Sequence, residues 1–304
     1  MKPISSAATE PGPSPLRDAV AASEAVADVP LLSIRTLEHW LAAIDTGETI
    51  AAEVRERTGS TNEDLLQRAR QRQPEGVQLC VAEEQTAGRG RQRRVWLARP
   101  RSALLFSLAV PLHRLPADLP AVTLAAGVAL AEVLGQRGVA VNLKWPNDLL
   151  VDGRKLGGIL CELAVDGDGR ATLVVGVGIN GWLTTQDREA IGQPAVALGE
   201  LVGSALLAGQ REAWLAALAA ALLQAVRAYA ADGFAVCRTR YNALLHARGQ
   251  LVDLLDGGRT HASGRIVEVD ASGRLVLDTS TGLRSFSVGD VSLRPVAAAP
   301  RDGR

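Results

Sequence analysis

Apolar and polar positions change their spacing several times along the chain, and each change marks a predicted element. Apolar residues spaced three and four apart indicate helices, two short ones near the start and two longer, alanine-rich ones later. Ser60 and Glu63 have the spacing of a capping box, which predicts a helix start there. Gly138 and Gly233 follow the two longer helices as stop signals. The predicted helices are 34–44, 60–72, 119–136 and 205–231.

Short apolar or alternating runs between these helices predict strands at 49–57, 77–85, 103–112 and 171–181. Residues 139–165 predict a strand, a turn, a second strand, a hairpin at Asp152-Gly153 and a third strand. After Tyr241 the pattern changes to short alternating runs interrupted by DGG, ASG and STG, which is typical of a small all-β unit. We therefore predict an α+β protein with a tail at 1–30, a mixed-sheet domain at 31–245 and a small β-domain at 246–297.

Composition limits the function classes. The chain of 304 residues carries 33 Lys plus Arg and 33 Asp plus Glu, and this neutral balance argues against a general nucleic-acid binder. Three cysteines without a CxxC pair and four histidines without HExxH spacing make structural zinc and disulfides unexpected. The N-terminal residues contain no apolar core of a signal peptide, and no apolar stretch looks able to span a bilayer, so we expect a cytoplasmic protein.

Two glycine-containing segments carry candidate chemistry. In GRGRQRRVW, residues 88–96, glycines alternate with arginines, which suits the binding of carboxylates or phosphates. The same segment could instead be only a basic turn exposed to solvent. A third interpretation, a nucleic-acid-binding patch, would need aromatic residues between the arginines to stack on bases. GVGING, residues 176–181, fits the dinucleotide pattern GxGxxG, but it lies late in the chain and precedes a poor helix start, so it is weak evidence for a nicotinamide site.

The stretch KWPNDLL, residues 144–150, holds more chemistry than a turn requires, although Asn and Asp after Pro are ordinary turn formers. Lysines and arginines nearby could bind an anionic substrate, and Asp148 could hold a divalent metal through its oxygens. This set suits nucleotidyl transfer, in which neutralising phosphate charge supplies much of the catalysis. Its members are Arg89, Arg91, Lys144, Asp148 and Lys155.

Five motifs in order, STN, EEQTAGRGRxxR-W, KWPND, GRKLGGIL-E and GVGIN, make the chain resemble the biotin protein ligases over residues 36–296. The resemblance implies a catalytic domain similar to class II synthetases and lipoyl ligases, followed by an SH3-like barrel. It also implies a reaction in two steps. Biotin and MgATP form biotinyl-5′-AMP, and a lysine of the biotin carboxyl carrier protein of acetyl-CoA carboxylase then takes the biotinyl group.

The resemblance assigns residue roles as well. Lys155, Arg91 and Asp148 are the expected catalytic residues, with Asp148 also the candidate metal ligand. The expected biotin-binding residues are Ser60, Thr61, Asn62, Gln85, Gly88, Arg89, Arg91, Trp96, Lys155, Gly158 and Leu160. The expected nucleotide-binding residues are Arg91, Arg94, Trp96, Lys144, Asn147, Lys155, Asn180 and Arg294.

The chain departs from the family pattern at Arg93, where a glycine is usual, and at LARP after Trp96, which puts the dynamics of the loop in question. Two other functions stay open, a lipoate or octanoate ligase and a ligase-derived biotin-sensing regulator. We expect no sequence-specific DNA binding, because the residues before Ser60 offer only one helix where a helix-turn-helix needs two. The chain could be a monomer or a homodimer.

Overall fold

The computed structural model describes residues 29–115, 119–256, 259–288 and 291–295, and it confirms the predicted fold class. One sheet of seven strands has the order β1-β2-β3-β7-β6-β5-β4. Strands β1 and β2 pair in parallel, and the other neighbours pair antiparallel. The strands are β1 Ile50–Thr58, β2 Val77–Gln85, β3 Ala103–Leu112, β4 Asn142–Lys144, β5 Asp148–Val151, β6 Arg154–Val165 and β7 Ala171–Asn180.

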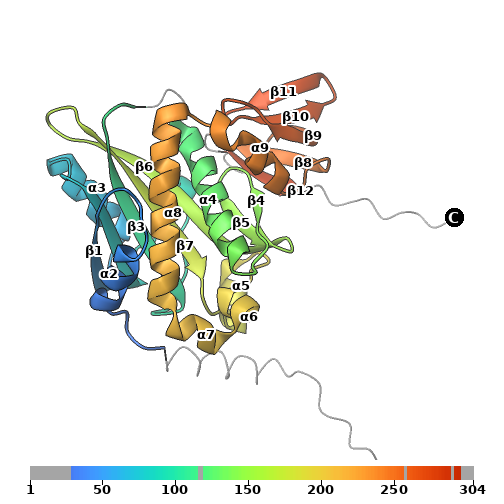
Figure 1. The fold of residues 1–304 in the computed structure, drawn as a ribbon. Coiled ribbons are helices and arrows are strands. Elements are labelled where there is room, and N and C mark those ends of the chain that lie inside the picture. Colours follow the sequence, from blue (N-terminus) through green and yellow to red (C-terminus); the bar gives the residue numbers. More distant parts are fainter. Residues whose placement is uncertain (1–28, 116–118, 257–258, 289–290, 296–304) are drawn as a thin grey trace, which may run out of the picture.

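Helices cover both faces of this sheet, so its central strands are buried on each side. On one face lie α4 Val122–Gln136 and α8 Arg211–Asp232, which run side by side across the sheet (Figure 1). On the other face α3 Thr61–Gln71 packs Leu65, Leu66 and Ala69 against β2, β3 and β6. The ten residues of β7 are all buried, which explains why its sequence is a nearly continuous apolar run.

The apolar segments Leu119–Gln136 and Arg211–Asp232 are long and hydrophobic enough to cross a membrane by length and composition alone. More than half of each is buried inside the protein, 61% and 56% respectively. Both contain the helices that cover the sheet, and burial in the core accounts for their apolar character.

The predicted helix at 205–231 is wrong in one respect, because the structure divides it. Helix α7 spans Ser204–Gly209, and α8 starts at Arg211 after Gln210, whose φ of −131° is not helical. Gly209 lowers the helix propensity at this point, and the side chain of Arg211 is drawn into the core by Glu83. Besides α3 and α4, the α-helices that precede α7 in the described residues are α2 Ile34–Ala42, α5 Thr185–Ile191 and α6 Leu198–Val202.

A second sheet follows α9 Ala235–Leu244, with the order β11-β10-β9-β8-β12 and antiparallel pairing throughout. Its strands are β8 Leu251–Asp256, β9 Arg259–Val269, β10 Leu275–Thr279, β11 Gly282–Phe286 and β12 Val291–Pro295. This agrees with the predicted all-β unit and is consistent with an SH3-like barrel. Trp145, buried beneath the KWPND turn, donates its indole N–H to the carbonyl of Gly273 at 3.2 Å and so joins the two sheets.

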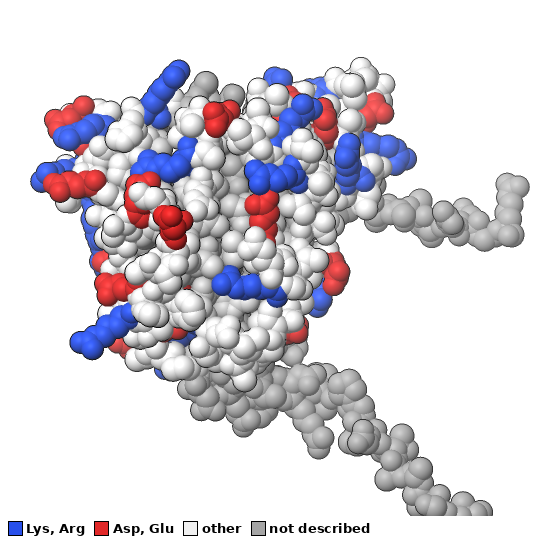
Figure 2. Space-filling model, viewed as in Figure 1, with Lys and Arg blue, Asp and Glu red and all other residues white. Residues whose placement is uncertain are grey.

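Charges of both signs are interspersed over the face shown in Figure 2, where Lys and Arg lie close to Asp and Glu. This distribution agrees with the neutral balance of the sequence. On this face, no large area of a single sign offers the footprint expected for a phosphate backbone.

Candidate active site

A cavity of about 780 Å³ lies where the predicted motifs meet. Its walls come from the start of α3, the end of β2, the segment 89–97, the strands β5 to β7, and His246 and Leu293 near the second sheet. Most of the predicted site residues line this cavity. They are Ser60, Thr61, Asn62, Gln85, Arg89, Arg91, Arg94, Trp96, Lys144, Asn147, Asp148, Lys155, Gly158, Leu160 and Asn180.

Two predicted residues have other positions. Gly88 lies behind the lining, where a Cβ would be 3.3 Å from Gln85 Nε2 and 3.1 Å from the carbonyl oxygen of Trp96. Arg294 belongs to β12, opposite Asp253, and its side chain is outside the described part of the structure. Its neighbour Leu293 lines the cavity, so β12 does reach the site.

One end of the cavity is a buried polar floor formed by Thr61, Asn62, Gln85 and Ser107. Gln85 Oε1 accepts the backbone N–H of Thr61 at 2.8 Å, and the hydroxyl oxygens of Thr61 and Ser107 are 2.7 Å apart. Ser107 donates to Asn62 Oδ1 at 2.7 Å. These contacts come from a helix start and two strands, so the floor is held by the fold itself.

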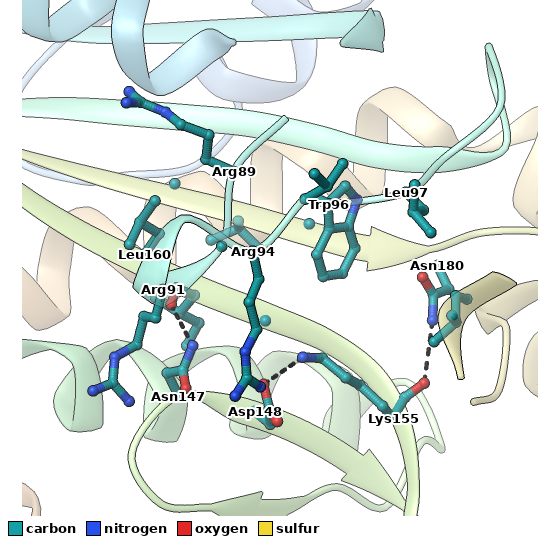
Figure 3. Close-up of a pocket in the computed structure, with 18 of the residues that line it drawn as sticks. Arg89, Arg91, Arg94, Trp96, Leu97, Asn147, Asp148, Lys155, Leu160 and Asn180 are labelled. Carbon is teal, nitrogen blue, oxygen red and sulfur yellow. Dashed lines mark hydrogen bonds and ion pairs between the residues drawn. The ribbon is translucent and has the colours of Figure 1, made fainter. Parts of the chain in front are cut away.

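The helix start at α3 is only half of a capping box. Ser60 Oγ accepts the N–H of Glu63 at 3.5 Å, which caps the helix as predicted. The Glu63 carboxylate, however, forms an ion pair with Arg89 and another with Arg70. Arg89 consequently points away from Lys155, whereas Arg94 extends toward the Asp148 side of the cavity (Figure 3).

The segment Gly88–Trp96 forms a small hairpin over the cavity, which we call the arginine loop. Trp96 N–H donates to the Gly88 carbonyl at 2.9 Å, and Gly90 N–H donates to the Arg94 carbonyl at 2.7 Å. At its tip Gln92 and Arg93 have φ values of 55° and 57°, in the left-handed region that disfavours side chains with a Cβ. The side chain of Arg93 therefore occupies a conformation that glycine would adopt more easily.

Lys155 and Asp148 form the charged centre of the cavity. Lys155 Nζ is 2.6 Å from Asp148 Oδ1, and the two side chains are 20% and 18% exposed. The ammonium also lies 5.8 Å from the centre of the Trp96 ring, within the range of a cation–π contact. Gly158 leaves room beside this pair, because a Cβ there would be 3.6 Å from Asp148 Oδ1 and 3.7 Å from Lys155 Cε.

Asn147 and Asn180 use their side-chain amides to hold the backbone around this pair. Asn147 Nδ2 donates to the Ile159 carbonyl at 3.0 Å, which fastens the KWPND turn to β6. Asn180 Nδ2 donates to the carbonyls of Lys155 and Val196, at 3.1 and 3.2 Å. These three bonds position Asp148 and Lys155, while the predicted nucleotide contacts of the two asparagines stay a prediction.

The glycines of GVGIN make room for neighbouring side chains. A Cβ on Gly176 would be 2.2 Å from Asn62 Oδ1, and one on Gly178 would be 2.5 Å from the Trp96 ring. Both glycines lie inside β7, and no helix begins directly after this strand. The segment therefore lacks the strand-to-helix turn of a dinucleotide fingerprint, and its glycines serve the polar floor and Trp96 instead.

The predicted roles left out several residues at or beside the cavity, among them Ser107, Trp145, Glu162 and His246, although Trp145 and Glu162 belong to the motifs KWPND and GRKLGGIL-E. Ser107 could have been noticed as a polar residue within the apolar run of β3, and it is completely buried. Glu162 accepts from Asn62 Nδ2 at 2.8 Å. Burial, and then the charge of Lys144, lower the pKa of His246. No sequence signal marked His246, because it reaches the site only through the packing of α9 and β4.

Burial raises the pKa of the Cys161 thiol to about 12 and that of Cys237 to about 11, and it also raises that of Cys80. None of the three lines the cavity. The thiols are therefore poor nucleophiles that lie outside the cavity, whereas the lysine, the carboxylate and the arginines line it.

Comparisons with known proteins agree with this geometry. The profile described as "Biotin/lipoate A/B protein ligase family" matches residues 54–180, and "Biotin protein ligase C terminal domain" matches residues 249–294. A Mycobacterium tuberculosis protein named biotin–[acetyl-CoA-carboxylase] ligase is 34% identical over 272 residues, which are 86% of this chain and 96% of that protein. The chain belongs to the biotin protein ligase family.

Other biotin protein ligases are similar over most of the chain. The Paracoccus denitrificans protein named biotin–[acetyl-CoA-carboxylase] ligase is 31% identical over 242 residues, covering 77% of this chain and 97% of its own length. The structure described as biotin protein ligase from Aquifex aeolicus in complex with biotin and ATP superimposes with a TM-score of 0.65 at 26% identity. It covers 81% of this chain and 99% of its own.

Proposed function

We infer that this protein is an ATP-dependent biotin protein ligase, which activates biotin as biotinyl-5′-AMP and transfers the biotinyl group to a lysine of a biotin carboxyl carrier protein. The observation that carries the inference is the Lys155–Asp148 pair, which lies between the polar floor and the arginine loop in one cavity. Family membership and the relatives that bind biotin and ATP support it.

The polar floor suits the head of biotin, and the apolar wall suits its tail. Thr61 and Gln85 offer hydrogen-bonding groups to a cyclic urea, and Leu160 and Trp96 face the space that leads toward Lys155. The chain of biotin would then direct its carboxylate to the charged centre. This orientation lowers the entropic cost of bringing the carboxylate and the nucleotide together.

In the first step, a carboxylate oxygen of biotin attacks the α-phosphorus of ATP, the bond to the bridging oxygen breaks, and pyrophosphate leaves. Lys155 stabilises the negative charge that develops at the α-phosphate, and Arg91 and Arg94 supply further positive charge from the loop. Trp96 shields Lys155 from water on one side. The roles assigned to these residues rest on their placement in the cavity.

In the second step, the neutral amine of the carrier lysine attacks the carbonyl carbon of biotinyl-5′-AMP, an amide forms, and AMP leaves. Asp148 is the carboxylate that lines the cavity in the described part of the chain, and it can accept a hydrogen bond from the incoming amine. The lysine ammonium gives up one proton to become this neutral amine, and the attacking nitrogen gives up a second as the amide forms; water or the departing AMP takes up both. We therefore assign Asp148 to orienting the carrier lysine.

The residues fit magnesium poorly as a resident metal. No group of three or more His, Cys, Asp or Glu that could hold a metal ion occurs among the described residues, and Asp148 is already paired with Lys155. Magnesium usually binds through substrate phosphates and one or two carboxylates. The ion therefore enters as part of MgATP, with Asp148 as the only carboxylate of the described lining that could assist.

The partner is a carrier domain of the acetyl-CoA carboxylase type, as the names of the relatives suggest. We propose that the protein works in the cytoplasm as a monomer or homodimer without binding an operator. In the described residues before β1, α2 is the one helix, where a helix-turn-helix would need two. A gel-shift assay with the promoter of its own biotin genes, at physiological salt, should give no specific complex.

The decisive experiment incubates the purified chain with MgATP, a carrier domain and either biotin, lipoate or octanoate. We expect mass spectrometry to find one biotinyl group on the carrier and no lipoyl or octanoyl group. A carrier whose acceptor lysine is replaced by arginine is the control, and it should stay unmodified. Transfer of lipoate at a similar rate would replace biotin ligation with the alternative function.

A further inference from the structure

A row of close polar contacts connects the polar floor to Glu162, a residue of β6 outside the cavity lining. Its contacts are Glu162 Oε2 to Asn62 Nδ2 at 2.8 Å, Asn62 Oδ1 to Ser107 Oγ at 2.7 Å, Ser107 Oγ to Thr61 Oγ1 at 2.7 Å, and Thr61 Oγ1 to Gln85 Oε1 at 3.1 Å. It begins at a carboxylate and ends at the cavity.

The direction of the hydrogens in this row follows from Glu162. A carboxylate and a backbone carbonyl can only accept, and Asn62 faces both Glu162 and the Leu160 carbonyl, at 2.8 and 3.3 Å. The amide nitrogen of Asn62 must therefore point to them, which leaves its oxygen facing Ser107. Ser107 then donates to Asn62, and Thr61 donates to Ser107.

This direction leaves the last contact one hydrogen short. Asn62, Ser107 and Thr61 each supply one hydrogen along the row, so three hydrogens serve the four contacts. Gln85 Oε1 cannot donate, and it already accepts the N–H of Thr61 at 2.8 Å. The contact without a hydrogen is that between Thr61 Oγ1 and Gln85 Oε1, which at 3.1 Å is also the longest of the four.

Two acceptor oxygens that face each other at the cavity wall are stabilised by a ligand that donates a hydrogen to them. We propose that Glu162 is a positioning residue that sets the direction of this row and so makes the site select a head group with an N–H donor. This rests on the proposed function, in which that donor is a ring N–H of the cyclic urea of biotin. Lipoyl and octanoyl chains have no N–H to offer, so the same device excludes them.

The tight packing around Asn62 keeps the row in place. A Cβ on Gly176 would come within 2.2 Å of Asn62 Oδ1, and Asn62 and Ser107 are 4% and 0% exposed. The middle of the row is therefore shielded from solvent water. Its direction depends on the acceptor-only groups at its far end, of which Glu162 is the one that can be substituted.

The test uses two biotin analogues, each with one ring N–H replaced by a ring oxygen, and compares them with biotin in the full-length protein. The dissociation constants and the KM values for adenylate formation are measured for wild type, Glu162→Gln and Ser107→Ala. Glutamine offers Asn62 a donor as well as an acceptor, so only the longer contact with the Leu160 carbonyl, at 3.3 Å, still favours the original direction of the row. Alanine at 107 releases the Thr61 hydrogen for Gln85. Thr172→Val is the control, because it removes a buried hydroxyl of β7 that lies outside this row.

We expect wild type to prefer biotin over at least one analogue by about a hundredfold, since a site built around a donor rejects a ligand that lacks it. Both variants should lower this preference at least about fivefold, with the KM for ATP within about twofold of wild type, because only the donor contact is altered. Thr172→Val should keep the full preference.

Equal weakening of biotin and both analogues in the two variants would overturn the proposal, since it would mean that Glu162 supports the structure only. If either variant is unstable, the other still tests the direction of the row, because the two act at different links. A wild-type protein that binds neither biotin nor its analogues would instead refute the proposed function, which is a different result.

Discussion

The polar floor and the arginine loop face the same cavity but are built in opposite ways. The floor consists of buried side chains at the start of α3 and inside the sheet, joined by short hydrogen bonds. The loop is largely exposed, with Val95 at 70% and two residues of positive φ at its tip. The floor can recognise one head group without rearrangement, whereas the loop is suited to reorganise around a nucleotide.

The largest effect should come from Lys155, where the two regions meet. Lys155→Ala removes the cation at the developing charge, and we expect adenylate formation to slow about a hundredfold or more. Biotin affinity should fall far less than the rate of adenylate formation, because the floor that binds the head of biotin is intact. Single-turnover formation of biotinyl-5′-AMP measures this, and Arg154→Ala, an exposed neighbour, is the control. Near-normal adenylation by the alanine variant would contradict the role.

The next largest effect is expected from two glycines of β7, because Gly176 lies against the polar floor and Gly178 lies against the arginine loop. In Gly176→Ala, the new methyl group collides with Asn62 in the floor, and overpacking there should cost about 2 kcal/mol and weaken biotin binding at least tenfold. In Gly178→Ala, the methyl group meets the Trp96 ring of the loop, which can move. Thermal unfolding and titration with biotin measure both.

We therefore expect Gly176→Ala to unfold about 5 °C below wild type, and Gly178→Ala to keep most of its stability. In Gly178→Ala the KM for ATP should rise more than the dissociation constant of biotin. If Gly178→Ala proves the less stable of the two, the loop is as rigid as the floor and the contrast between them is wrong.

Arg93 tests the loop alone. Its φ of 57° is easier for glycine by about 1 kcal/mol, so Arg93→Gly should favour the ordered loop about fivefold and slow the release of biotinyl-5′-AMP by a similar factor. Ligation should stay within about tenfold of wild type. Arg93→Ala, which removes the charge but keeps the strain, is the control. Complete loss of ligation in Arg93→Gly would make Arg93 a catalytic group.

The smallest effect concerns His246, which lies near Lys144 in a part of the cavity wall that belongs neither to the polar floor nor to the arginine loop. Its pKa is below the ordinary value of 6.5, first through burial and then through Lys144, so folding favours the neutral imidazole. The stability that this provides is present above pH 6.5 and declines as the pH falls below it. Melting temperatures are measured from pH 5 to 8, and below pH 6.5 the melting temperature of His246→Gln should fall slightly less steeply than that of wild type. If the two proteins lose stability equally at acid pH, His246 makes no such contribution to the pH dependence.

Much of this structure could be predicted from the local sequence. The period of the apolar residues located the strands of the large sheet, and Ser60 marked a real helix start. The five motifs indicated residues that do line one cavity, although they are spread over more than a hundred positions of the chain.

Tertiary packing decided what the sequence could not reveal. The Arg89–Glu63 ion pair depends on how the loop crosses α3, and the row from Glu162 to Gln85 joins four elements that are distant in sequence. Neither of these has a signature in a single sequence. The break at Gln210 is different, because Gly209 precedes it, and α5 is bounded by a capping box at Thr184 and Asp187 and by Gly192, so the sequence did contain local signals for both.

The indole of Trp145 has a consequence for how the protein is made. Its hydrogen-bond partner, Gly273, follows it by 128 residues, so the ribosome has synthesised the whole large sheet before this partner exists. Chains fold progressively from the N-terminus during synthesis. The turn that carries Asn147 and Asp148 thus receives its last support near the end of translation, and we expect a nascent chain to acquire ligase activity only when the second sheet has emerged.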